Sequence, residues 1–184
     1  MSDSAFNMKS TMYCALNRQY VTPELMGVLQ DFSTDMEEVF PQTKTLILDA
    51  NFPFIAGFPL LPHLSHNDGR KVDLAFFYKD DRGFLPGVTK SPIGYFAFEH
   101  GPSDCPKNAL TLRWDIAWLQ DLWPGYHLEP RRMMAALQFL SDDERIGKVF
   151  IEPHLKSRFR ANSSKIRFQG CRAARHDDHI HIQL

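Results

Sequence analysis

The chain has 184 residues, of which 43% are hydrophobic and 12% aromatic, and its formal net charge at pH 7 is -1. This length and composition exclude a disordered chain and predict one globular domain over residues 1–184. The charge gives no overall field that would attract polyanions, so we expect no nucleic-acid partner. No apolar stretch reaches the roughly 18 residues of a membrane-spanning helix, so we expect no transmembrane segment.

The first predicted element is an amphipathic helix over residues 23–39. Thr22 supplies an N-cap hydroxyl and Pro23 suits the first turn. Apolar residues then recur at three- and four-residue steps until Pro41 ends the helix. Residues 45–50 (TLILDA) follow as a short apolar strand.

The middle of the chain is mostly irregular by composition. Residues 51–70 are predicted as a loop, and 72–78 (VDLAFFY) as a strand that ends in a turn. Within the Pro- and Gly-rich segment 84–110, YFAF (95–98) is a candidate for brief pairing with a sheet. Residues 110–119 fit strand and helix equally, and this alternative stays open.

The last third contains a predicted helix at 130–141, a strand at 148–152 with a short helical turn after it, and a final strand at 179–184. Helices and strands do not alternate regularly along the chain. The pattern therefore predicts an α+β fold, with a small, mostly antiparallel sheet and flanking helices.

The three cysteines, Cys14, Cys105 and Cys171, lack the spacing of a zinc ribbon. One disulfide with one free thiol would fit an oxidising compartment, and three thiols would fit a reducing one. Cys171 lies five residues before His176 and is a candidate metal ligand. A cysteine ligand would, however, close the coordination position that a catalytic metal keeps open.

The first cluster of chemically reactive residues is HLSHNDGRKVDLAF (63–76). Asn67, Asp68 and Gly69 break any helix after His66, so the chain can turn and bring Asp73 alongside His66. On the predicted strand Asp73 points away from its apolar neighbours. A buried carboxylate needs a neutralising partner, for which a cation is one candidate.

The second cluster is HDDHIHIQL (176–184). In an extended strand His179, His181 and Gln183 share one face, while the alternating Ile and Leu residues share the other. This alternation indicates a half-buried strand and excludes a purification tag or a solvated tail. The two imidazoles lie roughly 7 Å apart at Cα. Both can then bind one ion, or one can bind it while the other acts on water or substrate.

Five of the eight histidines lie in these two segments. A single histidine is usually a hydrogen-bonded or solvated side chain, but two clusters beside strands, one with an aspartate, favour a metal site. Imidazole nitrogens with one carboxylate suit Zn²⁺, which is tetrahedral and keeps one position open in catalytic sites.

These residues also carry a resemblance to a known family, the penicillin-insensitive murein endopeptidases. The pattern H-x-x-H-x-x-G-x-x-x-D is met by His63, His66, Gly69 and Asp73, and H-x-x-H-x-H by His176, His179 and His181. The family belongs to the lysostaphin, D-alanyl-D-alanine peptidase and hedgehog group of zinc folds. The resemblance therefore implies a hedgehog/D-Ala-D-Ala peptidase-like fold and a single zinc metallopeptidase domain over residues 1–184.

The same resemblance implies roles for individual residues. His66, Asp73 and His181 would be the zinc ligands, and His179 the catalytic histidine. His63 and His176 would line the site as further candidates for proton transfer. Asp177 and Asp178 are candidates for fixing a histidine tautomer, although acids in an exposed turn would look the same in sequence.

The implied function is zinc-dependent hydrolysis of peptide bonds in bacterial peptidoglycan, at a cross-link of D-stereochemistry. The alternatives are a D-alanyl-D-alanine carboxypeptidase or dipeptidase, and a non-catalytic, zinc-containing, hedgehog-like binding module. Murein cross-link peptides would be the partner, and the oligomeric state stays open. The expected location is the periplasm or cell envelope; because the N-terminus shows no export leader, a cytoplasmic location stays open too.

Two further patterns in the sequence are weaker evidence about function. Residues 154–175 contain seven Lys or Arg and no acid, which is typical of a solvated face but would also suit binding of substrate carboxylates. The tryptophans Trp114, Trp118 and Trp123 are predicted to lie in the core rather than in a sugar-stacking surface.

Overall fold

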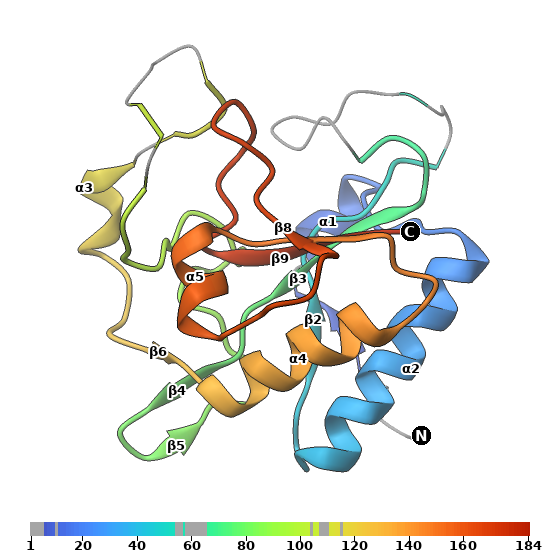
Figure 1. Ribbon diagram of the computed structural model, residues 1–184, viewed down its shortest axis with the longest axis horizontal. Coiled ribbons are helices and arrows are strands. Elements are labelled where there is room, and N and C mark those ends of the chain that lie inside the picture. Colours follow the sequence, from blue (N-terminus) through green and yellow to red (C-terminus); the bar gives the residue numbers. More distant parts are fainter. Residues whose placement is uncertain are drawn as a thin grey trace.

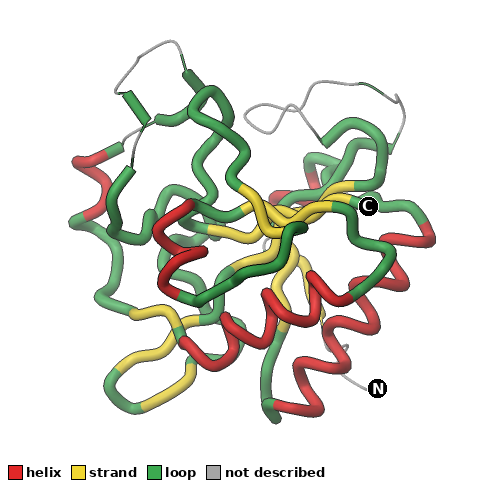
Figure 2. Tube along the Cα trace, in the orientation of Figure 1, coloured by secondary structure: helices red, strands yellow, loops and turns green. Residues whose placement is uncertain are grey.

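A computed structural model of the chain describes residues 6–9, 11–53, 57, 66–103, 105–106, 111–114 and 116–184. The fold is mixed α+β with mostly antiparallel sheets, as predicted (Figures 1 and 2). In this part of the chain the helices are α1 (Thr11–Ala15), α2 (Pro23–Val39), α3 (Ala117–Gln120), α4 (Pro130–Asp142) and α5 (Pro153–Arg158). None of them has the length and apolar character that a bilayer crossing requires.

Among the described residues, the main sheet has six strands in the order β1-β2-β3-β9-β7-β8. Their bounds are β1 (Phe6–Met8), β2 (Thr45–Ile47), β3 (Lys71–Ala75), β7 (Lys148–Phe150), β8 (Ile166–Arg167) and β9 (His179–Gln183). The predicted C-terminal strand is confirmed as β9, and it lies at the centre of the sheet between β3 and β7. The histidine cluster near the end of the chain is therefore part of the framework.

A second, three-stranded sheet consists of β4 (Tyr78–Asp80), β5 (Gly83–Phe84) and β6 (His127–Leu128). The prediction of one strand over 72–78 is wrong, because the chain leaves the main sheet after Ala75 and enters the small sheet at Tyr78. Phe76 and Phe77 are both buried in the core. Consecutive residues of a strand point to opposite faces, so burial of both side chains in one core requires the strand to break.

Other predictions are confirmed in part. The apolar segment 45–50 is a strand only as far as Ile47, and 95–98 is not a strand. Residues 110–119, which fitted a strand and a helix equally, contain the start of the short helix α3 at Ala117. The helical turn predicted after the 148–152 strand is α5.

The main core lies between one face of the large sheet and the two long helices. Figure 2 shows α2 and α4 along the same side of the yellow strands. Both predicted helices are confirmed. The Thr22 side chain accepts a hydrogen bond from the Leu25 N–H at the start of α2, and Glu129 caps α4 in the same way. Each fully buried leucine of these helices contributes about 1.5–3 kcal/mol by leaving water.

The two faces of β9 have different partners. Ile180 and Ile182 are fully buried in the core beneath α2 and α4. His179 and His181 point to the other face, away from those helices, as the predicted alternation requires. On this second face a smaller apolar cluster forms around Tyr13, Leu48 and Tyr95.

A disulfide joins Cys105 to Cys171, and Cys14 is a free thiol. The pairing is one of the two cysteine states that the sequence left open. It excludes Cys171 as a metal ligand in this structure, because its sulfur is bonded to Cys105. The bridge connects the segment before Trp114 to the segment before Arg175.

Candidate metal centre

The pairing of β3 with β9 brings together residues that are far apart in sequence. Asp73 lies directly opposite His181 in the antiparallel ladder, and Ala75 lies opposite His179. Residues opposite each other in such a pair share a face of the sheet. The predicted proximity of the two clusters is therefore a direct result of strand register.

His66 joins this pair from the loop that precedes β3. Its Nδ1–H donates to the carbonyl of Ala50 at 3.0 Å, which turns Nε2 toward Asp73 and His181. The predicted turn after His66 is confirmed: Gly69 has φ +76°, and a Cβ there would lie 3.2 Å from the Thr22 side chain. Glycine suits this position because it combines a left-handed backbone with a close contact.

Three atoms of this group form a compact triangle. His181 Nδ1 lies 2.8 Å from Asp73 Oδ1 and 3.1 Å from His66 Nε2, and His66 Nε2 lies 3.3 Å from Asp73 Oδ1. Tetrahedral zinc with bonds of roughly 2.0–2.2 Å would separate neighbouring ligand atoms by roughly 3.3–3.6 Å. The shortest edge of the triangle therefore has to lengthen by about 0.5–0.8 Å, and the other two edges by less. This buried group could hold a metal ion.

The second carboxylate oxygen of Asp73 has a different partner. Tyr95 donates its hydroxyl proton to Asp73 Oδ2 at 2.6 Å. Burial, reinforced by the charge of Asp73, raises the pKa of Tyr95 well above its ordinary value, so the phenol stays protonated. Tyr95 thus leaves Oδ1 as the oxygen that faces the two histidines. Sequence reasoning missed Tyr95, because it reaches the site from an irregular segment without a motif.

His179 lies beside the triangle. Its Nδ1–H donates to Asp178 Oδ1 at 2.5 Å, and its Nε2 lies 3.6 Å from Asp73 Oδ2. Because a carboxylate only accepts, Asp178 fixes the tautomer of His179 and makes Nε2 the basic atom. Of the two acids predicted for such a role, only Asp178 has it: Asp177 accepts two hydrogen bonds from Arg175.

His176 completes the cluster of imidazoles. Its ring centroid lies 4.8 Å from that of His179 and 5.5 Å from that of His181. Its backbone N–H donates to Glu152, which is held in turn by a bidentate pair with Arg113. The predicted site residue His63 lies outside the described residues.

The protonation of His181 makes the stability of the protein without metal depend on pH. Burial lowers the pKa of His181 to about 4, against a smaller upward effect of its hydrogen bond to Asp73. An unfolded histidine titrates near pH 6.5. Between these values the unfolded chain binds more protons, so the free energy of unfolding falls as the pH drops from 6.5 to 4.

We therefore expect chelator-treated wild type to lose up to about 3 kcal/mol more stability than His181→Gln over this pH range. Burial raises the pKa of Asp177 to about 6, which acts in the opposite direction. Because both proteins contain Asp177, its contribution to the pH dependence of stability cancels when they are compared. Urea unfolding at each pH measures the free energy of unfolding of both proteins. If it varied equally with pH in both, the lowered pKa of His181 would be contradicted as the cause.

Gln183 offers a second test of how His181 is oriented. Its Nε2 lies 3.1 Å from His181 Nε2, on the side of the ring opposite the triangle. A cation on Nδ1 leaves the proton on Nε2, so the residue at position 183 then has to accept a hydrogen bond. We expect Gln183→Glu to tighten zinc binding roughly tenfold and Gln183→Leu to weaken it by a similar factor. Competition with a chromophoric chelator measures both, with Gln138→Glu on the exposed face of α4 as control.

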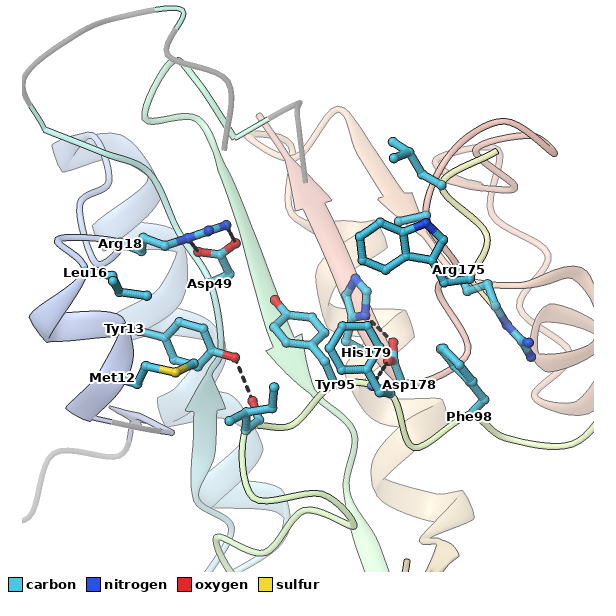
Figure 3. Close-up of a pocket in the computed structure, with 15 residues that line it drawn as sticks. Met12, Tyr13, Leu16, Arg18, Asp49, Tyr95, Phe98, Arg175, Asp178 and His179 are labelled. Carbon is cyan, nitrogen blue, oxygen red and sulfur yellow. Dashed lines mark hydrogen bonds and ion pairs between the residues drawn. The ribbon is translucent and has the colours of Figure 1, made fainter. Parts of the chain in front are cut away.

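A cavity of about 190 Å³ opens beside His179 (Figure 3). Figure 3 shows Met12, Tyr13 and Leu16 on one side and Phe98 and Arg175 on the other, with Tyr95 and His179 between them. Trp114 also lines the cavity and is 47% exposed, and Trp118 is 74% exposed. The prediction that these two tryptophans lie in the core is therefore wrong.

The fold and the site together define an α+β protein with a buried centre of two imidazoles and one carboxylate, and with a third imidazole beside a cavity. No protein-family model matches the sequence, and no curated protein matches it. The resemblance to murein endopeptidases consequently stays a prediction.

Proposed function

We propose that the protein is a zinc-dependent metallopeptidase that hydrolyses a peptide bond of bacterial peptidoglycan, at a cross-link of D-stereochemistry. We propose with it that the fold is of the hedgehog/D-Ala-D-Ala peptidase type. The observation that carries the proposal is the buried triangle of His66, Asp73 and His181, with the basic nitrogen of His179 3.6 Å from Asp73. A purely structural metal site has no need of a fourth, oriented group.

The donor set favours zinc over harder cations. Two imidazole nitrogens and one carboxylate oxygen suit zinc, whereas calcium and magnesium prefer oxygen ligands alone. When bound, zinc supplies Lewis acidity, which polarises a carbonyl and makes water a stronger nucleophile near neutral pH.

The residues around the triangle provide the proton transfer. His179 Nε2 accepts a proton from the attacking water, and the same atom returns it to the leaving amine. Asp178 stabilises the imidazolium that forms in between, through its hydrogen bond at Nδ1. Tyr95 holds Asp73 in one orientation, so the Oδ1 oxygen of this carboxylate stays directed at His66 and His181.

The proposed location is the periplasm or cell envelope, where peptidoglycan is found. The disulfide between Cys105 and Cys171 supports an oxidising compartment, since such bonds are rare in the cytosol. In this location the substrate would be the cross-linked peptide itself.

The test is incubation of the zinc-loaded protein with purified cross-linked muropeptides, with products followed by mass spectrometry. We expect release of un-cross-linked peptides, and no release after treatment with a chelator. Cleavage of D-Ala-D-Ala termini alone would replace the endopeptidase assignment with a carboxypeptidase. A metal-loaded protein that cleaves none of these substrates would support the binding-module alternative.

A further inference from the structure

The cavity beside His179 has a mostly apolar lining. Its walls include Met12 and Leu16 from α1 and the turn after it, Phe96 and Phe98 from the irregular segment, and Trp114. Met12, Leu16 and Trp114 are each more than a third exposed. Large apolar side chains that are held at the rim of a cavity are typical of ligand sites.

The charged residues of the cavity are paired with each other or with neighbours. Arg18 forms a bidentate ion pair with Asp49. Arg175 binds Asp177 through two hydrogen bonds and places its guanidinium 3.9 Å from the Phe98 ring centroid. Each arginine therefore has its charge balanced within the protein. The cavity consequently favours an uncharged occupant over a carboxylate.

Three other basic residues of the 154–175 segment also have partners within the protein. Lys156 and Lys165 donate to backbone carbonyls of Ile166 and Asp143, and Arg167 donates to the carbonyl of Ser164. These side chains stabilise the fold locally. The contacts of these three residues and of Arg175 therefore do not support the interpretation that they clamp substrate carboxylates.

The cavity wall is connected to the reactive histidine. Phe96 has φ +65°, a conformation that a bulky residue rarely adopts. Its N–H donates to Asp178 Oδ2 at 2.6 Å, and its carbonyl accepts from Trp123 and Gln120. Asp178 therefore holds both the ring of His179 and the backbone of the wall. A side chain bound in the cavity would lie at a defined position relative to His179.

We propose that this cavity is a subsite for one large apolar side chain of the substrate, adjacent to the bond that is hydrolysed. The inference rests on the proposed peptidase function and specifies its substrate further: a peptide, cross-linked or not, with a residue of leucine or phenylalanine size beside that bond. A buried apolar cavity of roughly 150 Å³ is large enough for benzene.

The test uses a peptide series, N-acetyl-Ala-X-Ala-amide, in which X is Gly, Ala, Leu or Phe in L- and D-forms. Binding is measured by calorimetry on the chelator-treated protein, and hydrolysis is followed by mass on the zinc-loaded protein. We expect Leu and Phe peptides of one stereochemistry to bind at least roughly tenfold more tightly than Gly. Trp114→Ala and Leu16→Asn should reduce this preference to roughly threefold or less. Trp118→Ala, at an exposed position outside the cavity, should keep it.

The outcomes separate this inference from the proposed function. Selective binding without hydrolysis of any peptide or muropeptide would remove the peptidase function and keep the apolar subsite. Hydrolysis with equal affinity for all X would keep the peptidase function and overturn the subsite. A preference for Leu and Phe that survives both cavity variants would also overturn it, because the selectivity would then arise elsewhere.

Discussion

Replacing His179 with alanine is expected to lower the rate of peptide hydrolysis roughly 10²- to 10⁴-fold. The expectation follows from the geometry around its ring: Asp178 fixes the proton on Nδ1, and Nε2 is left as the basic atom next to the ligand triangle. Alanine removes the group that we propose accepts and returns the proton. It leaves all three ligand atoms in place, so the zinc content should stay near one ion per chain.

The matched control is His127→Ala, which removes an exposed histidine on β6. It should change neither hydrolysis nor zinc content. A second variant, Asp178→Asn, keeps the size of the side chain but can present an amide donor to His179, and should lower hydrolysis with metal retained. Full activity in His179→Ala would show that another group transfers the proton.

Asp73→Asn should weaken zinc binding by more than about a hundredfold and abolish hydrolysis as a result. Asp73 is fully buried and contacts His66, His181 and Tyr95 at once. It brings the negative charge that offsets a cation in this buried setting. Asparagine preserves the volume but removes the charge, so a loss of binding would reflect electrostatics rather than a cavity.

Zinc affinity by chelator competition and zinc content by elemental analysis measure this effect. Asp81→Asn, in the exposed turn between β4 and β5, is the control and should bind zinc like the wild type. Unchanged zinc affinity in Asp73→Asn would overturn the ligand assignment. Thermal unfolding of the variant without metal establishes that the chain still folds.

Much of this site was predictable from local sequence. The alternation of Ile180 and Ile182 with His179 and His181 predicts a strand with one apolar face and one face of imidazole side chains. The structure has this strand. The break after His66 also follows from local residues, because Gly69 adopts a left-handed conformation that few other residues tolerate. The alternation is a strong signal because it repeats over several positions, and the glycine is a strong signal because its backbone conformation is rare for other residues.

Other features depend on contacts that no local pattern encodes. The hydrogen bond from Tyr95 to Asp73 joins an irregular segment to a strand. The small sheet is held by strands of two or three residues, too short for a periodic signal. The pairing of Arg175 with Asp177 depends on side-chain positions, so composition alone left its basic run open to a substrate-binding interpretation.

The alignment of β3 with β9 has a consequence for how the protein acquires its site. A shift of this pairing by one residue would invert one strand relative to the other, turning either Asp73 toward the helices or Ile182 toward the cavity side. Either inversion would bury polar side chains in the core and expose aliphatic surface. The free energy that excludes the wrong alignment is therefore supplied by the core, and the candidate metal ligands are assembled as a by-product. A chain that has folded correctly already has its ligands in place, before any ion arrives.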